Sequence, residues 1–73
     1  MEIKVIGTNS SNRIKLIKNI KKATDNNIDI KLVENANRYN ITNTPALVIN
    51  DKIISQGKVL NEREIKKFIE VLA

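Results

Sequence analysis

The chain has 73 residues, and neither cysteine nor histidine is among them. Without cysteine it forms no disulfide, offers no thiolate nucleophile and ligates no iron–sulfur cluster. Without histidine it lacks the side chain that most often serves as a general base near neutral pH and as a metal ligand. The sequence therefore argues against redox and transition-metal chemistry, and we expect no cofactor and no metal site.

Aromatic residues and long apolar runs are also scarce. Tyr39 and Phe68 are the only aromatic residues, so the core has to consist of isoleucine, leucine and valine. No apolar run approaches the roughly 20 residues that a membrane-spanning helix needs, and Met1–Ile6 is too short and too charged for a signal peptide. We expect one domain over residues 1–73, which is cytoplasmic, monomeric and without a membrane partner.

Positively charged residues outnumber negatively charged ones, 13 to 8. The formal net charge is +5 and the isoelectric point about 9.8. Such a balance favours polyanionic over cationic partners, but it does not identify a function.

The first half of the chain predicts a β-α-β unit. Glu2–Ile6 alternates polar and apolar residues and stops at Gly7, which is typical of a strand. A polar loop follows, and its side chains are of the kinds that cap helices. Apolar residues then recur at helical spacing, and Ile28–Val33 alternates again as a second strand. One helix between two strands predicts parallel pairing and a right-handed crossover. The residues of the apolar helix face are Leu16, Ile17, Ile20, Ala23 and Thr24.

The second half predicts a hairpin and a closing helix. The only proline, Pro45, directly precedes the apolar run Ala46–Ile49, and a tight polar connector leads to a further strand at Ile53–Gly57. The polar stretch from Glu34 to Asn40 is predicted to be a short helix or turn. The last helix begins after Asn61, which forms a capping-box pattern with Glu64. Its apolar face comprises Ile65, Phe68, Ile69 and Leu72.

The predicted order is β-α-β-(α)-β-β-α, an α/β fold with a four-stranded mixed sheet flanked by helices. Ile28–Val33 and Ile53–Gly57 are expected to be the edge strands. A β-α-β half, a proline after a polar loop, a hairpin and a closing helix resemble the thioredoxin fold in its smallest, glutaredoxin-like form. The strings that carry the resemblance are Met1–Thr8, Thr44–Asn50 with Lys52, and Gly57-Lys58-Val59.

The resemblance implies a cis peptide bond at Thr44–Pro45 and a Cys-x-x-Cys pair at the start of the first helix. Here the corresponding residues are Ser10, Ser11, Asn12 and Arg13. Ser10 stands where the family has its nucleophilic cysteine, and Arg13 where it has the resolving cysteine. A serine hydroxyl without an activating base cannot replace a thiolate, and arginine cannot resolve a mixed disulfide. Thiol–disulfide exchange by these residues is excluded, and we expect no enzyme of that kind.

The resemblance also places Ser10, Arg13, Thr44 and Pro45 at one end of the sheet. In redox relatives the residue before the cis proline pairs its backbone with an extended substrate, and Thr44 is its equivalent. The first hypothesis is therefore a redox-inactive binding module for an extended peptide, a protein or a small anion, with the amides of the helix start and Arg13 contributing. In the plainer alternative, Ser10 and Ser11 only cap the helix and Arg13 is solvated.

A second hypothesis is binding to the phosphate backbone of nucleic acid. No acidic residue lies between Thr8 and Thr24, and the helix between them is rich in lysine. There is, however, no recognised motif and no aromatic array for base stacking, so a solvated helix face is the simpler explanation. The lysines concerned are Lys15, Lys18, Lys21 and Lys22.

A third hypothesis is pairing of another chain with an exposed sheet edge, either Ile28–Val33 or Ile53–Gly57. Asp29 and Lys31 on one edge and Lys52 near the other are typical of edge protection, which weakens this hypothesis. A non-redox enzyme ranks last, because the sequence shows no carboxylate pair, no glycine-rich phosphate loop and no nucleophile–base couple.

Overall fold

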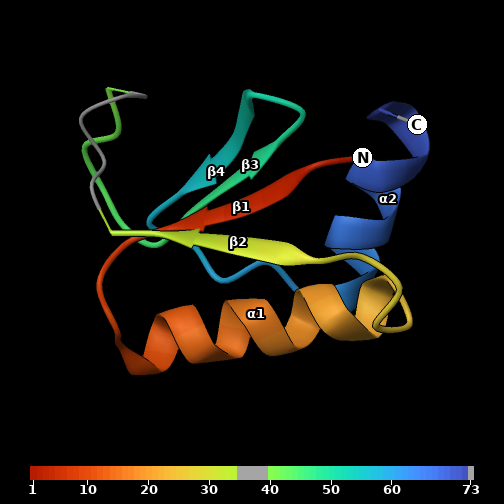
Figure 1. Cartoon of the computed structure of the whole chain (residues 1–73), viewed down its shortest axis with the longest axis horizontal. Helices are drawn as coiled ribbons and strands as arrows, with labels where there is room; N and C mark the ends of the chain where they lie inside the picture. The colour runs from red at the N-terminus through yellow and green to blue at the C-terminus, as the bar shows by residue number, and fades with distance from the viewer. Residues whose placement is uncertain (35–39, 73) are drawn as a thin grey trace.

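The computed structural model describes residues 1–34 and 40–72, which form a four-stranded sheet and two helices (Figure 1). The predicted short helix or turn from Glu34 to Asn40 falls almost wholly outside the described residues. The elements in chain order are β1 (Ile3–Ile6), α1 (Ser11–Ala23), β2 (Ile30–Val33), β3 (Ala46–Ile49), β4 (Lys52–Gln56) and α2 (Glu62–Leu72).

The strands lie in the order β2-β1-β3-β4. β1 pairs in parallel with β2 and antiparallel with β3, and β3 pairs antiparallel with β4. The predicted mixed sheet and its two edge strands are therefore confirmed. The parallel pair follows from the helical crossover between its strands, and the antiparallel pair β3–β4 follows from its tight turn.

Each outer strand differs in its bounds from the sequence prediction. The alternating pattern predicts a strand over Ile28–Val33, yet β2 begins at Ile30, which is opposite Ile3 at the start of β1. Strand length in a sheet is limited by the neighbour that supplies hydrogen bonds, and Ile28 has no partner on β1. β4 begins at Lys52 because Asn50 and Asp51 alone form the turn, both with positive φ as in two-residue hairpins.

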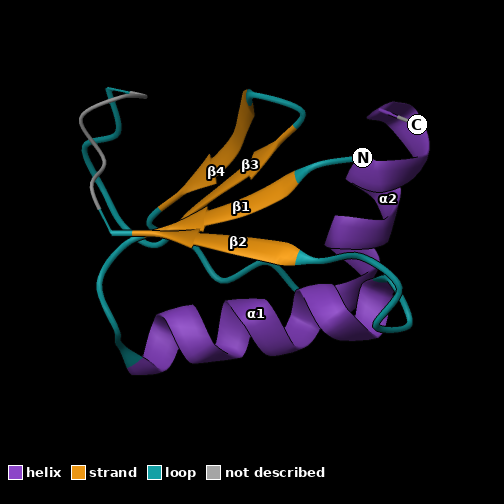
Figure 2. Ribbon diagram, in the orientation of Figure 1, coloured by secondary structure: helices purple, strands orange, loops and turns teal. Residues whose placement is uncertain are grey.

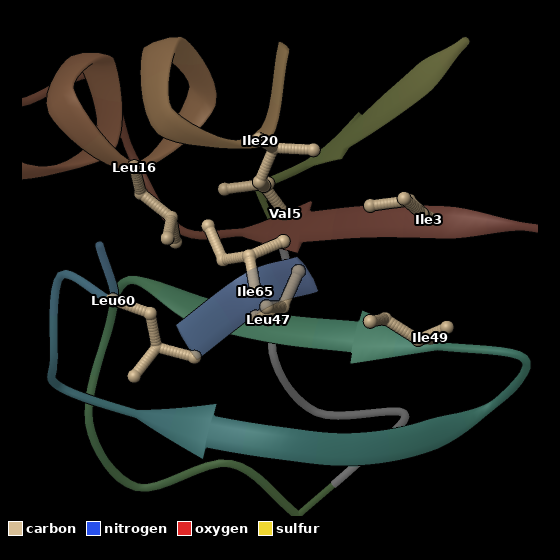
Figure 3. Close-up of a cluster of buried hydrophobic side chains, with 8 residues drawn as sticks. All are labelled: Ile3, Val5, Leu16, Ile20, Leu47, Ile49, Leu60 and Ile65. Atoms are coloured by element: carbon tan, nitrogen blue, oxygen red, sulfur yellow. The ribbon is translucent and has the colours of Figure 1, made fainter. Parts of the chain in front are cut away.

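Both helices contribute to a core on one face of the sheet (Figures 2 and 3). Alternate residues of β1 and β3 point to this face, because side chains along a strand alternate between the two faces. Figure 3 shows Leu16 and Ile20 of α1 and Ile65 of α2 converging on these strand residues. The buried cluster consists of Ile3, Val5, Leu16, Ile20, Leu47, Ile49, Leu60 and Ile65.

The intervening residues of the central strands form a second, smaller cluster on the opposite face. Ile6, Ala46 and Val48 are buried there, with Val33 and Ile41 packed against them. β3 is thus apolar on both faces and buried at every position, whereas β1 has Lys4 beside Ile6 on the second face. This explains why Ala46–Ile49 is a continuous apolar run rather than an alternating one.

The predicted capping box holds the start of α2. The side chain of Asn61 accepts from the Glu64 amide at 2.8 Å, and the Glu64 carboxylate accepts from the Asn61 amide at 3.2 Å. On the apolar face of this helix Ile65 is buried and Ile69 is half-buried. Phe68, predicted on the same face, is 39% exposed and lines a hollow together with Ile53 and Ile54 of the edge strand β4.

Candidate functional site

The site begins with the loop between β1 and α1. Ser10 is the N-cap of α1: its backbone is extended, and its hydroxyl oxygen accepts from the Arg13 amide at 3.2 Å. Ser11 and Asn12 follow as exposed residues of the first turn. Their amides have no carbonyl partner within the helix, as at every helix start. The cap expected of Ser10 or Ser11 is therefore made by Ser10.

The side chain of Arg13 folds back over this loop. Its Nη1 donates to the carbonyl of Gly7 and its Nη2 to Oδ1 of Asn9, both at 3.3 Å. The residue is half-buried, and no described residue accepts from its Nε. Arg13 is therefore not simply solvated, whereas the helix cap in the same alternative is made by Ser10. The guanidinium braces the β1–α1 loop and places a fixed positive charge beside the helix start.

Gly7 connects this loop with the Thr44–Pro45 segment. The φ angle of Gly7 is +144°, and a Cβ atom there would lie 3.0 Å from Cβ of Thr44 and 3.5 Å from Cα of Pro45. Gly7 therefore contacts the segment before β3 while its carbonyl oxygen accepts from Arg13. Figure 2 shows the two loops at the same end of the sheet.

Thr44 and Pro45 differ in exposure. Their peptide bond is cis. Pro45 is buried, and its carbonyl accepts from the Gly57 amide at 2.9 Å, whereas Thr44 is exposed. Among residues 1–34 and 40–72, none forms a hydrogen bond with the backbone of Thr44.

The electrostatics of this end favour anions. The first turn of α1 contains no acidic residue, and a helix N-terminus carries a partial positive charge. The guanidinium of Arg13 adds a full charge. Amides and a guanidinium are the groups that bind carboxylates and phosphates in proteins.

Comparison with known families adds to this geometry. A family model described as a thioredoxin domain matches residues 1–70. The chain belongs to this family. No curated protein and no solved structure matches the sequence of this thioredoxin domain.

Gly7 and Asn9 of this thioredoxin domain accept hydrogen bonds from Arg13, and the sequence did not assign either residue to the candidate site. The sequence places Gly7 at the end of a strand and Asn9 in a polar loop, but neither position indicates which distant residue it will contact. The contact between Gly7 and Thr44 joins residues 37 positions apart. Only the pairing of β1 with β3 brings them together.

The four lysines of the nucleic-acid hypothesis all lie on α1. All of them are exposed, and none makes an ion pair with a described residue. The role of Lys15, Lys18, Lys21 and Lys22 in nucleic-acid binding stays a prediction.

In the described part of this thioredoxin domain, no three Asp or Glu residues lie together as a metal site would require. Neither α1 nor α2 is long and apolar enough to cross a bilayer.

Proposed function

We propose that this thioredoxin domain is a non-catalytic binding module. It holds an extended peptide or a small anionic ligand on the surface formed by the start of α1 and the Thr44–Pro45 segment. The non-catalytic part of the proposal is supported by the sequence. Ser10 and Arg13 occupy the two positions where the family resemblance implies cysteines. Binding can outlast the loss of the cysteines, because backbone amides and carbonyls do not depend on them.

The observation that carries the proposal is the connection through Gly7. Thr44 is exposed and its side chain lies next to Gly7, and the carbonyl of Gly7 accepts from Arg13. A ligand strand that pairs with the N–H and C=O of Thr44 therefore runs past a glycine without a side chain. Its carboxylate, or a separate small anion, then lies within reach of Arg13 and the amides of Ser11 and Asn12.

An NMR titration of labelled protein tests this proposal. Reduced glutathione and a short extended peptide serve as ligands, and the amides of Ser10–Arg13 and Thr44 are the reporters. We expect saturable shifts confined to these positions. The same peptide with an amidated C-terminus shows whether a carboxylate contributes, since it should bind more weakly.

Two arginine variants provide the matched comparison. Arg13→Gln removes the charge at the helix start, and Arg63→Gln removes an exposed charge on α2. The first should raise the Kd for anionic ligands about tenfold, the effect of losing one charge-assisted hydrogen bond. The second should leave it unchanged. An absence of shifts at millimolar ligand, or equal effects of the two variants, would contradict the proposal.

The exposed lysines of α1 support nucleic-acid binding as a second candidate function. Phosphate contacts release counterions, so affinity has to fall steeply as salt rises. A gel shift with duplex and single-stranded oligonucleotides at several salt concentrations measures this directly. Lys15→Gln/Lys18→Gln should weaken the shift if this candidate is right, with Lys66→Gln/Lys67→Gln on α2 as the control.

A further inference from the structure

The outer edge of β2 is unpaired, although the sequence there has the pattern of a longer strand. β2 hydrogen-bonds only with β1, and no other described strand lies beside it. The alternation of apolar and polar residues begins at Ile28, two residues before the strand that the single chain forms. A neighbour on the open side would supply hydrogen bonds to Ile28 that the single chain does not.

The direction of the backbone groups along β2 follows from one hydrogen bond. The Gly7 amide donates to the carbonyl of Val33 at 2.8 Å, so the backbone groups of Val33 point toward β1. Backbone groups alternate in direction along a strand, so those of Lys31 also point toward β1. Those of Ile30 and Leu32 point away from it, to the open edge.

The side chains beside this edge are apolar and partly exposed. Ile30 is paired with Ile3, and Leu32 with Val5, so both lie on the face that α1 covers. Leu32 is nevertheless 51% exposed. A hollow of about 390 Å³ lies between α1 and this edge, and its lining includes Ile17, Lys21, Ile28 and Leu32.

We infer that this edge pairs with the same edge of a second copy of the chain, antiparallel and centred on Ile30. In this register the Ile30 residues of the two copies are opposite each other, and Ile28 of each copy is opposite Leu32 of the other. These pairs are the hydrogen-bonded ones, because their backbone groups point outward. All of their side chains lie on the α1 face, where they cover one another's exposed apolar surface.

The charges of the strand favour a second copy of the chain as the partner, and they favour the register centred on Ile30. Centring on Ile30 sets Asp29 of each copy opposite Lys31 of the other, twice in the dimer. These are non-hydrogen-bonded pairs, whose side chains lie closest together. Centring on Lys31 would instead set two lysines opposite each other, which is destabilising. The segment Ile28-Asp29-Ile30-Lys31-Leu32 is thus complementary to itself when antiparallel.

Asp29 and Lys31 are both exposed in the single chain. The side chain of Lys31 is 64% exposed, and its Nζ lies 3.2 Å from the carboxylate of Glu2. Charges of one sign along an edge would prevent pairing, but opposite charges two positions apart permit it with an identical strand. Because only one short strand pair forms, we expect a weak dimer that dissociates on dilution.

The test is sedimentation velocity of the full chain from micromolar to millimolar concentration, with four variants. Lys31→Asp and Asp29→Lys each set like charges opposite each other and should raise the dimer Kd at least tenfold. The double variant D29K/K31D restores opposite charges and should return the Kd to within about threefold of the starting protein. Lys52→Asp, on the other edge strand, should leave the Kd unchanged.

The double variant separates pairing from folding. Lys31→Asp and D29K/K31D both lose the ion pair with Glu2, so the loss of that ion pair cannot explain a difference in Kd between them. Circular dichroism confirms that each variant is folded. In mixed labelled and unlabelled protein, an isotope-filtered NOE between the α-protons of Asp29 and Lys31 reports the register directly. A monomer at millimolar concentration, or a dimer that D29K/K31D does not restore, would overturn the inference.

Discussion

Arg13 stands at a position where the family resemblance implies a resolving cysteine, and in this chain its side chain binds the preceding loop. Its guanidinium donates to Gly7 and Asn9, so it stabilises the loop between β1 and α1. The same side chain adds positive charge where α1 begins. One residue thus supports the local fold and the proposed affinity for anions.

Arg13→Ala should lower the free energy of unfolding by about 1–2 kcal/mol, because it removes a part-buried hydrogen bond to Gly7 and an exposed one to Asn9. Urea denaturation followed by circular dichroism measures the change. Arg63→Ala is the control, since Arg63 is exposed and makes no ion pair with a described residue. Equal effects of the two substitutions would show that Arg13 does not brace the loop.

Gly7→Ala should be more damaging, with a loss of about 1–3 kcal/mol for the strained backbone alone. At φ +144° an L side chain is disfavoured, and the new Cβ would meet Cβ of Thr44 at 3.0 Å. Gly57→Ala is the comparison, because its φ of +68° lies in the left-handed region that L residues tolerate better. Thermal unfolding should rank Gly7→Ala as the less stable variant, and the reverse order would contradict this account.

At the scale of the element, α1 owes its start to Ser10. Two serines stand in succession, but only Ser10 has the extended backbone of a cap and accepts the Arg13 amide. The helix ends where Thr24 donates its hydroxyl to the carbonyl of Ile20 at 2.9 Å, just before Asp25 and Asn26 adopt positive φ. Both ends are therefore fixed by local side chains.

Ser10→Ala should lower the free energy of unfolding by about 1 kcal/mol, the usual effect of losing an N-cap. Ser11→Ala should be neutral or slightly stabilising, because Ser11 is exposed inside the helix and alanine has the higher helix propensity. Chemical denaturation of the two variants side by side distinguishes the roles. A larger loss of stability for Ser11→Ala than for Ser10→Ala would contradict the assignment of Ser10 as the N-cap.

At the scale of the whole molecule, Glu2 connects several segments at the end of the sheet remote from Gly7. Its carboxylate accepts from Lys31 of β2 at 3.2 Å and pairs with Lys4 of β1 at 3.3 Å. Its backbone exchanges two hydrogen bonds with Asn50 of the hairpin turn, each 2.9 Å long. The hydrogen bond from Lys31, followed by that from Lys4, lowers the pKa of Glu2 below its ordinary value of 4.5.

A lowered pKa in the folded state means that the folded protein binds this proton less tightly than the unfolded chain does. The stabilisation by the Glu2 carboxylate is therefore complete above pH 4.5 and is lost as the pH falls through the folded-state pKa. In Glu2→Gln the melting temperature should therefore fall less between neutral pH and pH 3 than it does in the starting protein, as measured by thermal unfolding. Glu70→Gln is the control. If Glu2→Gln lost as much stability at acid pH as the starting protein does, the Glu2 carboxylate would not be the cause of that loss.

Local chemistry along the sequence determined much of this protein. The alternation in Glu2–Ile6, the 3.6-residue spacing in both helices and the Asn61–Glu64 capping box act over a few residues, so the element order and both edge strands were predictable. The lack of cysteine likewise excluded thiol chemistry without any structure.

Only the tertiary structure decided how the distant parts of the site meet. Gly7 contacts Thr44 because β1 pairs with β3, and Arg13 folds back because a carbonyl and an amide oxygen lie within its reach. The start of β2 was set by where β1 begins, against the longer pattern in its own sequence. Such contacts depend on which surfaces are brought together, and no short stretch of sequence encodes its distant partner.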